Sequence, residues 1–158
     1  MTAPETRVSR VCLLLNAEDA RYAVVGATAM QLWGTSRTTR DIDILIDPTV
    51  ANAERVLRAL SALPFRIASE IEPSELVSRP VTMIGETRNV DVLRRARNLR
   101  WEEAEQDLAV FEIEGVPVPT VSLANLIASK RTGRPQDVAD IQVLQELQRL
   151  RRAPATES

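Results

Sequence analysis

The chain has 158 residues, of which 44% are apolar, so it is long enough for one domain with a substantial core and too short for two. Its net charge of −2 excludes an overall basic field that attracts nucleic acid or an anionic membrane, so a polyanion must be met locally. The sequence has no histidine and one cysteine, Cys12, which excludes Ser-His-Asp and Cys-His catalysis and an internal disulfide, and argues against a zinc site. Carboxylates are therefore expected to carry any acid–base or metal chemistry.

The first predicted element is an amphipathic helix that ends near Asn16. Four residues recur there at helical spacing: Val8, Val11, Cys12 and Leu15. The next segment, YAVVGATAMQLWG, predicts a strand over Tyr22–Val25, a turn at Gly26 and a helix from Ala27 to Trp33. A strand, a glycine turn and a helix N-terminus in this order favour phosphate binding, although a single glycine more often serves only as a tight turn.

The segment TTRDIDILID predicts a strand that begins at about Asp41. One phase of the strand is apolar and consists of Ile42, Ile44 and Ile46. Because side chains alternate along a strand, Asp41 and Asp43 share the opposite face. Pro48 ends the strand, and an amphipathic helix follows from Val50 to Leu63.

The middle of the chain predicts a short strand near Phe65–Ala68, a helical turn after Pro73 and an antiparallel hairpin in VTMIGETRNVDVLR. The second strand of this hairpin carries a third acid, Asp91, on the face opposite Val90 and Val92.

The last third of the chain predicts a short helix in WEEAEQDL, then a second hairpin around Glu114-Gly115, whose prolines indicate a sheet edge. Two helices follow, from Ser122 to about Arg131 and from Pro135 to about Arg152. No apolar stretch is long enough to span a bilayer, and MTAPETRVSR lacks the apolar core of a signal peptide, so we expect a cytoplasmic protein.

Three carboxylates at close range repel one another, and a divalent cation is a common solution. Magnesium prefers oxygen ligands and is often completed by substrate phosphates, and two such ions could serve a nucleophile and a leaving phosphate. An Asp-x-Asp pair at the start of a strand can also be simple turn chemistry. The glycine turn and Asp91 favour the metal interpretation.

The motif VVGATAMQLWGTSRTTRDIDILID, followed by NVDVL, resembles the nucleotidyltransferase superfamily, and most closely the bacterial AbiEii-like toxins and their small stand-alone relatives. Eight residues match that group's pattern in register: Gly26, Ala29, Gly34, Arg37, Thr39, Asp41, Ile42 and Asp43. The later segment SLANLIASKRTGRPQDVADIQVL is similar to the group's C-terminal signature, with Lys130, Arg134, Asp137 and Asp140 at matching positions.

The resemblance implies that Asp41, Asp43 and Asp91 hold magnesium, with two ions expected, and that Asp91 also helps to activate the attacking hydroxyl. It further implies that Gly26 and Ala27 hold the triphosphate of an NTP. Five residues have expected roles near the phosphates or between the last two helices: Lys130 and Arg37 as phosphate contacts, and Arg134, Asp137 and Asp140 as ties between the helices. A solvated surface charge is the alternative for Lys130.

The implied fold is α/β, a mixed and twisted nucleotidyltransferase sheet with helices mainly on one face and a short C-terminal helical pair. We expect one domain over 1–152, with a core over 1–120, a helical pair over 121–152 and a disordered tail over 153–158. The implied reaction moves an NMP from an NTP to a hydroxyl acceptor, which could be RNA, a protein or a small molecule, possibly within a toxin–antitoxin system.

One residue departs from the family pattern: Ala27 stands where the family has glycine or serine. Alanine keeps a small side chain and the backbone N–H but lacks a hydroxyl. The alternative function is therefore a catalytically inactive member of the fold that binds a nucleotide or a partner protein. A partner chain, or a second copy of this chain bound through the leucine stripe of the last helix, would then supply the missing binding surface.

Overall fold

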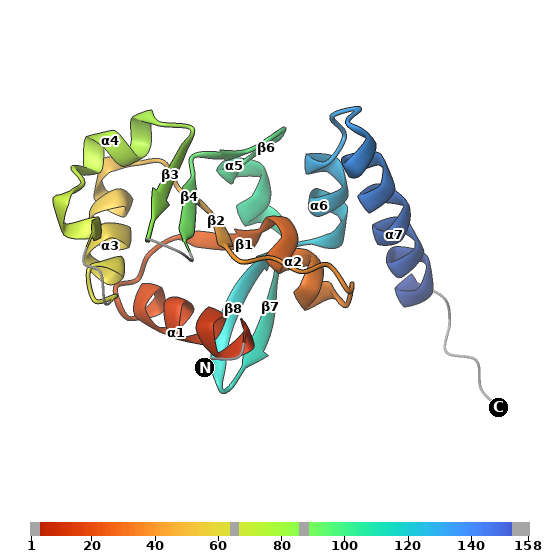
Figure 1. Ribbon diagram of the computed structural model, residues 1–158, viewed down its shortest axis with the longest axis horizontal. Coiled ribbons are helices and arrows are strands. Elements are labelled where there is room, and N and C mark those ends of the chain that lie inside the picture. The colour runs from red at the N-terminus through yellow and green to blue at the C-terminus, as the bar shows by residue number, and fades with distance from the viewer. Residues whose placement is uncertain (1–3, 64–66, 86–88, 153–158) are drawn as a thin grey trace.

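The computed structural model describes residues 4–63, 67–85 and 89–152, and within these ranges six strands form one mixed sheet (Figure 1). In spatial order the strands are β3 (Val81–Ile84), β4 (Val90–Leu93), β2 (Ile42–Ile46), β1 (Tyr22–Val25), β8 (Val116–Val121) and β7 (Leu108–Ile113). Two short strands, β5 (Arg95–Ala96) and β6 (Leu99–Arg100), pair separately. The mixed α/β sheet expected from the sequence is confirmed.

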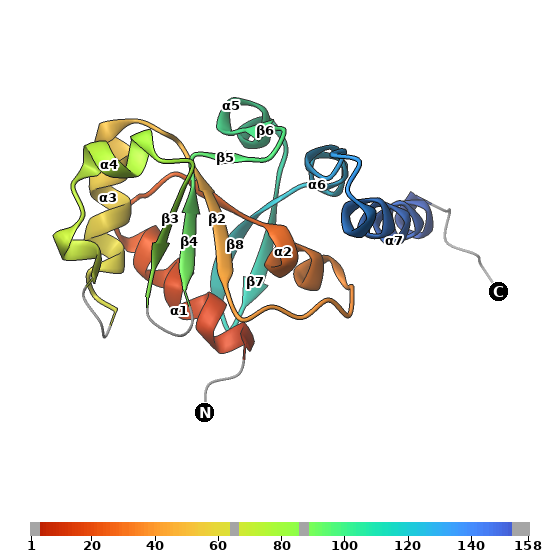
Figure 2. The ribbon, with the colours of Figure 1, turned by 45° about the horizontal axis from the view of Figure 1, so that its top comes forward.

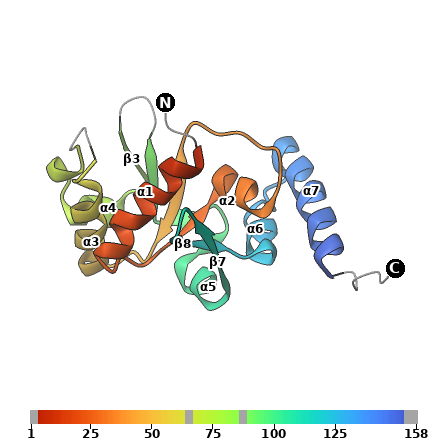
Figure 3. The same cartoon turned by 90° about the horizontal axis from the view of Figure 1, so that it is seen from below.

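The α-helices of the described ranges are α1 (Pro4–Ala17), α2 (Gly26–Trp33), α3 (Val50–Leu60), α4 (Pro73–Ser78), α5 (Trp101–Ala104), α6 (Leu123–Ser129) and α7 (Pro135–Arg152). Short 3-10 helices lie at Ile67–Glu70 and Glu105–Asp107. Helix α1 contacts β8, β7 and α3, and Figure 3 shows it in front of the sheet when the molecule is seen from below. In Figure 1, α5 and β6 lie on the other side of the sheet from α1.

Strand β2 is the centre of the arrangement because it pairs in parallel with β4 and antiparallel with β1. Asp43 lies opposite Asp91 on one side and opposite Val25 on the other. Residues in register on neighbouring strands project to the same face, so the two carboxylates lie next to each other. Gly26 directly follows Val25, and the glycine turn therefore begins beside Asp43.

The isoleucine residues of β2 explain why Asp43 lies on the less buried face of the strand. Ile42, Ile44 and Ile46 are at most 3% exposed, whereas Asp43 is only half-buried. Burying the three isoleucine side chains contributes roughly 2 kcal/mol each. A shift by one residue would place both phases on the wrong faces, so the hydrophobic pattern fixes the register.

Helix α1 buries the four residues that its spacing singled out: Val8, Val11, Cys12 and Leu15. Burial raises the pKa of Cys12 to about 11, so the thiol remains protonated. Helix α2 ends at Gly34, whose φ of +114° lets its N–H donate to the carbonyls of Met30 and Gln31.

Two expectations about the sheet are wrong. The strand expected near Phe65–Ala68 is absent in its described part, because Ile67–Glu70 forms a 3-10 helix; residues 64–66 lie outside the described residues. The prolines of the second hairpin do not mark an edge either, because β8 lies between β1 and β7. Strand β8 pairs with β1 at one registered position, Val24 with Thr120. Because few backbone hydrogen bonds form on that side of β8, the prolines, which lack an N–H, are tolerated there.

The last two helices lie together at one end of the molecule (Figure 2). The hydroxyl of Ser122 accepts a hydrogen bond from the N–H of Asn125 and caps α6 as expected. The apolar residues of α7 are buried unequally. Leu144 is fully buried, whereas Val138 is 45% and Leu150 56% exposed. The expected tail, 153–158, lies outside the described residues. No helix in the described part of the chain has the length and apolar character needed to cross a membrane.

Candidate active site

The centre of the candidate site is the carboxylate pair of Asp43 and Asp91. The pKa of Asp43 is raised to about 7, most of all by burial. The charge of Asp91, a hydrogen bond with Asp91 and the charge of Asp41 raise it further, whereas the charge of Lys130 lowers it. Burial also raises the pKa of Asp91. Its Oδ1 atom is buried and has no hydrogen-bond partner among the described residues. Two carboxylates held this close, one with an unpartnered oxygen, favour a proton or a cation beside them.

Asp41, the third predicted acid, lies just before β2. Its Oδ1 atom accepts a hydrogen bond of 2.9 Å from the N–H of Asn89, next to β4. Its carbonyl oxygen accepts hydrogen bonds from the hydroxyls of Thr28 and Thr39, at 3.1 and 3.2 Å. Asp41 is thus near enough to raise the pKa of both other acids, but one of its oxygens is already bound to the backbone.

Gly26 is required at its position for two independent reasons. Its φ is +66°, a backbone conformation that side-chain-bearing residues rarely adopt. A methyl group in its place would also overlap Oδ2 of Asp43. The turn therefore brings the backbone of Gly26 and Ala27 directly against the carboxylate, as a phosphate site beside a metal site requires.

A cavity of about 420 Å³ opens in front of Asp43. Most of the predicted site residues line it: Gly26, Ala27, Arg37, Asp43 and Lys130. Asp41 and Asp91 do not belong to its lining. Two arginines that the sequence analysis did not assign to the site, Arg95 and Arg97, complete the wall. The segment LRRARNLR was a signal for them, but nothing in the sequence indicated that β5 would turn back over the cavity.

Lys130 is the C-cap residue of α6 and is 7% exposed. Its Nζ atom lies 3.0 Å from Oδ2 of Asp140 and 3.8 Å from Oδ1 of Asp137. The Nη1 atom of Arg37 also donates to both oxygens of Asp140, at 2.8 and 2.6 Å. Asp140 on α7 therefore holds two cations that line the cavity.

Asp137 and Asp140, the two buried acids of α7, are ionised. Burial alone would raise the pKa of Asp140, but hydrogen bonds from Lys130, Arg37 and Gln136 lower it overall. A hydrogen bond from Thr132 is the main cause that lowers the pKa of Asp137, which Arg97 and Arg134 also approach at 3.8 and 3.7 Å. These contacts join α7 to α6, to the hairpin of β5 and β6 and to the segment before β2.

The carboxylates fit a divalent cation in part. In their present positions, no three acidic, cysteine or histidine side chains of the described ranges form a group that could hold a metal ion. The unpartnered Oδ1 of Asp91 and the raised pKa of Asp43 are nevertheless what a pair of cation ligands shows without its cation. Asp43 and Asp91 therefore fit the ion, and Asp41 would join them through its Oδ2 atom while its Oδ1 atom stays bonded to the N–H of Asn89.

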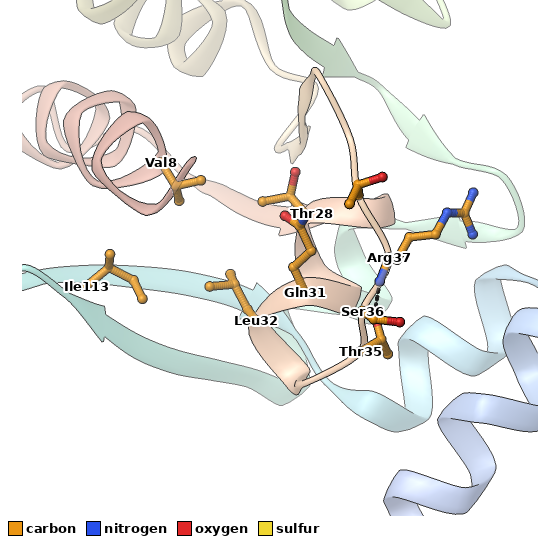
Figure 4. Close-up of a pocket in the computed structure, with 9 residues that line it drawn as sticks. Val8, Thr28, Gln31, Leu32, Thr35, Ser36, Arg37 and Ile113 are labelled. Atoms are coloured by element: carbon orange, nitrogen blue, oxygen red, sulfur yellow. Dashed lines mark hydrogen bonds between the residues drawn. The ribbon is translucent and has the colours of Figure 1, made fainter. Parts of the chain in front are cut away.

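A second cavity, of about 390 Å³, lies on the other side of the segment that joins α2 to β2 (Figure 4). Thr28, Gln31 and Leu32 of α2 line it together with Val8 of α1 and Ile113 of β7. Arg37 belongs to the lining of both cavities, so this segment forms the wall between them.

Comparisons with known proteins identify the family and the fold. The family model described as nucleotidyl transferase AbiEii toxin, type IV toxin–antitoxin system, matches residues 11–157. None of the curated proteins matches the chain.

Two solved structures resemble the fold. One is an antigenic nucleotidyltransferase-like protein from Paracoccidioides brasiliensis, with a TM-score of 0.63 and 17% identity over 92% of this chain and 75% of the other. The second is a candidate nucleotidyltransferase from Thermotoga maritima, with a TM-score of 0.54 and 20% identity over 96% of this chain and 93% of the other. At these identities the likeness concerns the fold.

Proposed function

The chain belongs to the AbiEii family of nucleotidyl transferase toxins from type IV toxin–antitoxin systems, and on that premise we propose that it transfers an NMP from a magnesium-bound NTP to a hydroxyl acceptor. The observation that carries the proposal is the carboxylate pair of Asp43 and Asp91, of which Asp43 lies against the turn at Gly26 and lines a cavity whose wall also carries basic side chains. Such a site has an acidic side for metal and a basic side for phosphate.

Each residue then has a role that its position supports. Asp43 and Asp91 hold magnesium, joined by Asp41, and two ions are expected. The backbone of Gly26 and Ala27 cradles the triphosphate at the start of α2, and Arg37 and Lys130, which line the same cavity, contact its phosphates. Bound magnesium would neutralise the carboxylates and the phosphate charge that develops during transfer.

The reaction is a displacement at the α-phosphorus. The acceptor oxygen forms a bond to this phosphorus, the bond to the bridging oxygen of the β-phosphate breaks, and pyrophosphate leaves. Asp91 lies next to Asp43 and accepts the proton of the acceptor hydroxyl, which then passes to solvent. Ala27 supplies its backbone N–H and no hydroxyl, so the cations of the cavity wall carry more of the phosphate binding.

The acceptor side of the site is basic. Arg94, Arg95 and Arg100 line a further cavity of about 300 Å³, and Arg95 also lines the cavity at Asp43. Arg95 and Arg100 face each other in register on β5 and β6, and Glu102 in the same cavity and Glu103, 4.0 Å from Arg100, offset only part of this positive charge. We therefore favour an acceptor with anionic groups among the RNA, protein and small-molecule classes.

The remaining assignments follow from the family. An antitoxin is the expected partner protein, and the cytoplasm, where NTPs are available, is the proposed location. The chain acts as one domain, in which Lys130 at the end of α6 lines the cavity and Asp140 of α7 holds Lys130 by an ion pair.

Calorimetric titration of each Mg-NTP tests the proposal without knowledge of the acceptor. Wild-type protein should bind at least one NTP only when magnesium is present, and the Asp41→Asn, Asp43→Asn double variant should not. Glu146→Gln, on the exposed face of α7, is the matched control and should bind as the wild type does. Magnesium-independent binding, or equal binding by the double variant, would contradict the proposed site.

A further inference from the structure

The side chain of Arg7, on α1, reaches the starts of β2 and β4, the two strands at which the acids lie. Its Nη1 atom donates to the carbonyl of Arg40 at 3.1 Å, and its Nη2 atom donates to the carbonyl of Asn89 at 3.0 Å. These carbonyls directly precede Asp41 and the start of β4. One planar guanidinium therefore joins the starts of β2 and β4, which are adjacent in the sheet. In sequence, Arg40 and Asn89 lie 33 and 82 residues from Arg7.

The same peptide group links Arg7 to Asp41. The N–H of Asn89 donates to Oδ1 of Asp41 at 2.9 Å, and the carbonyl of Asn89 also accepts from the N–H of Ile42 at 3.0 Å. Arg7 thus fixes the carbonyl of Asn89, while Asn89 fixes the carboxylate of Asp41. A bidentate arginine is suited to this task because its two donors keep a fixed geometry, whereas a lysine ammonium is a single point.

We propose that Arg7 is a positioning residue of the metal site, which holds the starts of β2 and β4 so that Asp41 and Asp91 remain within reach of one divalent cation. The role depends on the proposed function, because it concerns the carboxylates that would bind the ion. It differs from a purely structural bridge, since a bridge between α1 and the sheet would affect stability without affecting the affinity for metal.

The probe is Mn²⁺ alone, bound to the full chain without nucleotide and followed by electron paramagnetic resonance. Arg7→Met should weaken Mn²⁺ binding by about tenfold or more, as loss of a group that orients metal ligands commonly does. Arg7→Lys keeps the charge but reaches one carbonyl, so it should recover part of this loss. Arg10→Met, on the same helix and exposed, should bind as the wild type does.

Amide hydrogen exchange supplies a readout without metal. The N–H groups of Asn89 and Ile42 should exchange faster in Arg7→Lys than in the wild type, while that of Val24 on β1 is unchanged. Mn²⁺ affinity within twofold of wild type in Arg7→Lys and in any folded Arg7→Met would overturn the role of Arg7 and leave the proposed function intact. A wild type that binds no Mn²⁺ without nucleotide would also overturn the role of Arg7 in a preformed metal site, whereas the proposed function is contradicted only by the Mg-NTP titration.

Discussion

Gly26 and Asp43 approach so closely that no methyl group fits between the Cα atom of the glycine and Oδ2 of the aspartate. Their contact joins the start of α2 to the middle of β2, two elements separated in sequence by the segment that carries Arg37. The phosphate side and the metal side of the proposed site therefore share one point of the backbone.

Gly26→Ala should abolish Mg-NTP binding and lower the free energy of unfolding by about 1–2 kcal/mol or more, since the new methyl group meets Asp43 and φ is positive. Gly115→Ala is the matched control, because Gly115 has a φ of +80° and open space around it. This control should lose similar stability and keep nucleotide binding. Calorimetry and urea unfolding measure the two effects, and equal loss of binding in both variants would contradict the prediction.

Asp43→Asn should make the metal-free protein more stable at pH 8. The pKa of Asp43, about 7, lies above its ordinary value of 3.8, so the folded state binds more protons than the unfolded state in this interval. Stability of the wild type should therefore fall as the pH rises from about 4 to 7, and the variant should lose this slope. Urea unfolding in EDTA at several pH values measures it.

Addition of magnesium should make the wild type more stable than Asp43→Asn, the reverse of their order in EDTA at pH 8. The ion stabilises the folded wild type by binding to it, whereas Asp43→Asn has lost a ligand and gains little. A wild type whose unfolding midpoint at pH 8 does not move when millimolar magnesium replaces EDTA would count against the metal site.

Asp140→Asn should destabilise the protein by about 3 kcal/mol, because it leaves Lys130 buried without its nearest carboxylate and releases Arg37. The lowered pKa of Asp140 means that its contribution is present above the ordinary value of 3.8 and is lost as the pH falls through the folded value. Glu146→Gln removes an exposed pair with Arg149 and should change stability little. Urea unfolding at pH 7 and at acid pH compares the variants.

Arg95→Gln should weaken Mg-NTP binding by about fivefold and reduce its dependence on salt, because Arg95 lines both the cavity at Asp43 and the neighbouring arginine-lined cavity. Arg149→Gln removes the same charge from the exposed face of α7 and serves as the control. Titration at two ionic strengths measures both effects. Identical affinities and salt slopes in the two variants would exclude a phosphate contact by Arg95.

The sequence predicted the strand and helix limits best where one local rule decides them. The apolar run over Tyr22–Val25, the alternation of Ile42 with Asp43 and the serine cap at Ser122 each specify their element without help from the rest of the chain. The family resemblance, carried by spaced residues in three segments, is confirmed by the match over residues 11–157.

Long-range geometry was not available from the sequence. Periodicity places Asp43 and Asp91 on a face of their own strands, but only the pairing of β2 with β4 makes them neighbours. The contact of Arg7 with Asn89 spans 82 residues and follows from no local pattern. The short run at Ile67–Glu70 was misjudged because a few apolar residues fit a strand and a 3-10 helix equally well.

Asp140 is a shared counter-ion for Arg37 and Lys130, which both line the cavity at Asp43. One carboxylate therefore holds the two cations close to each other at the cavity wall. If the site binds a triphosphate as proposed, the phosphate would compete with Asp140 for these cations and would not have to assemble them. Nucleotide affinity would then be set by an exchange between two anions, one of which is part of the last helix.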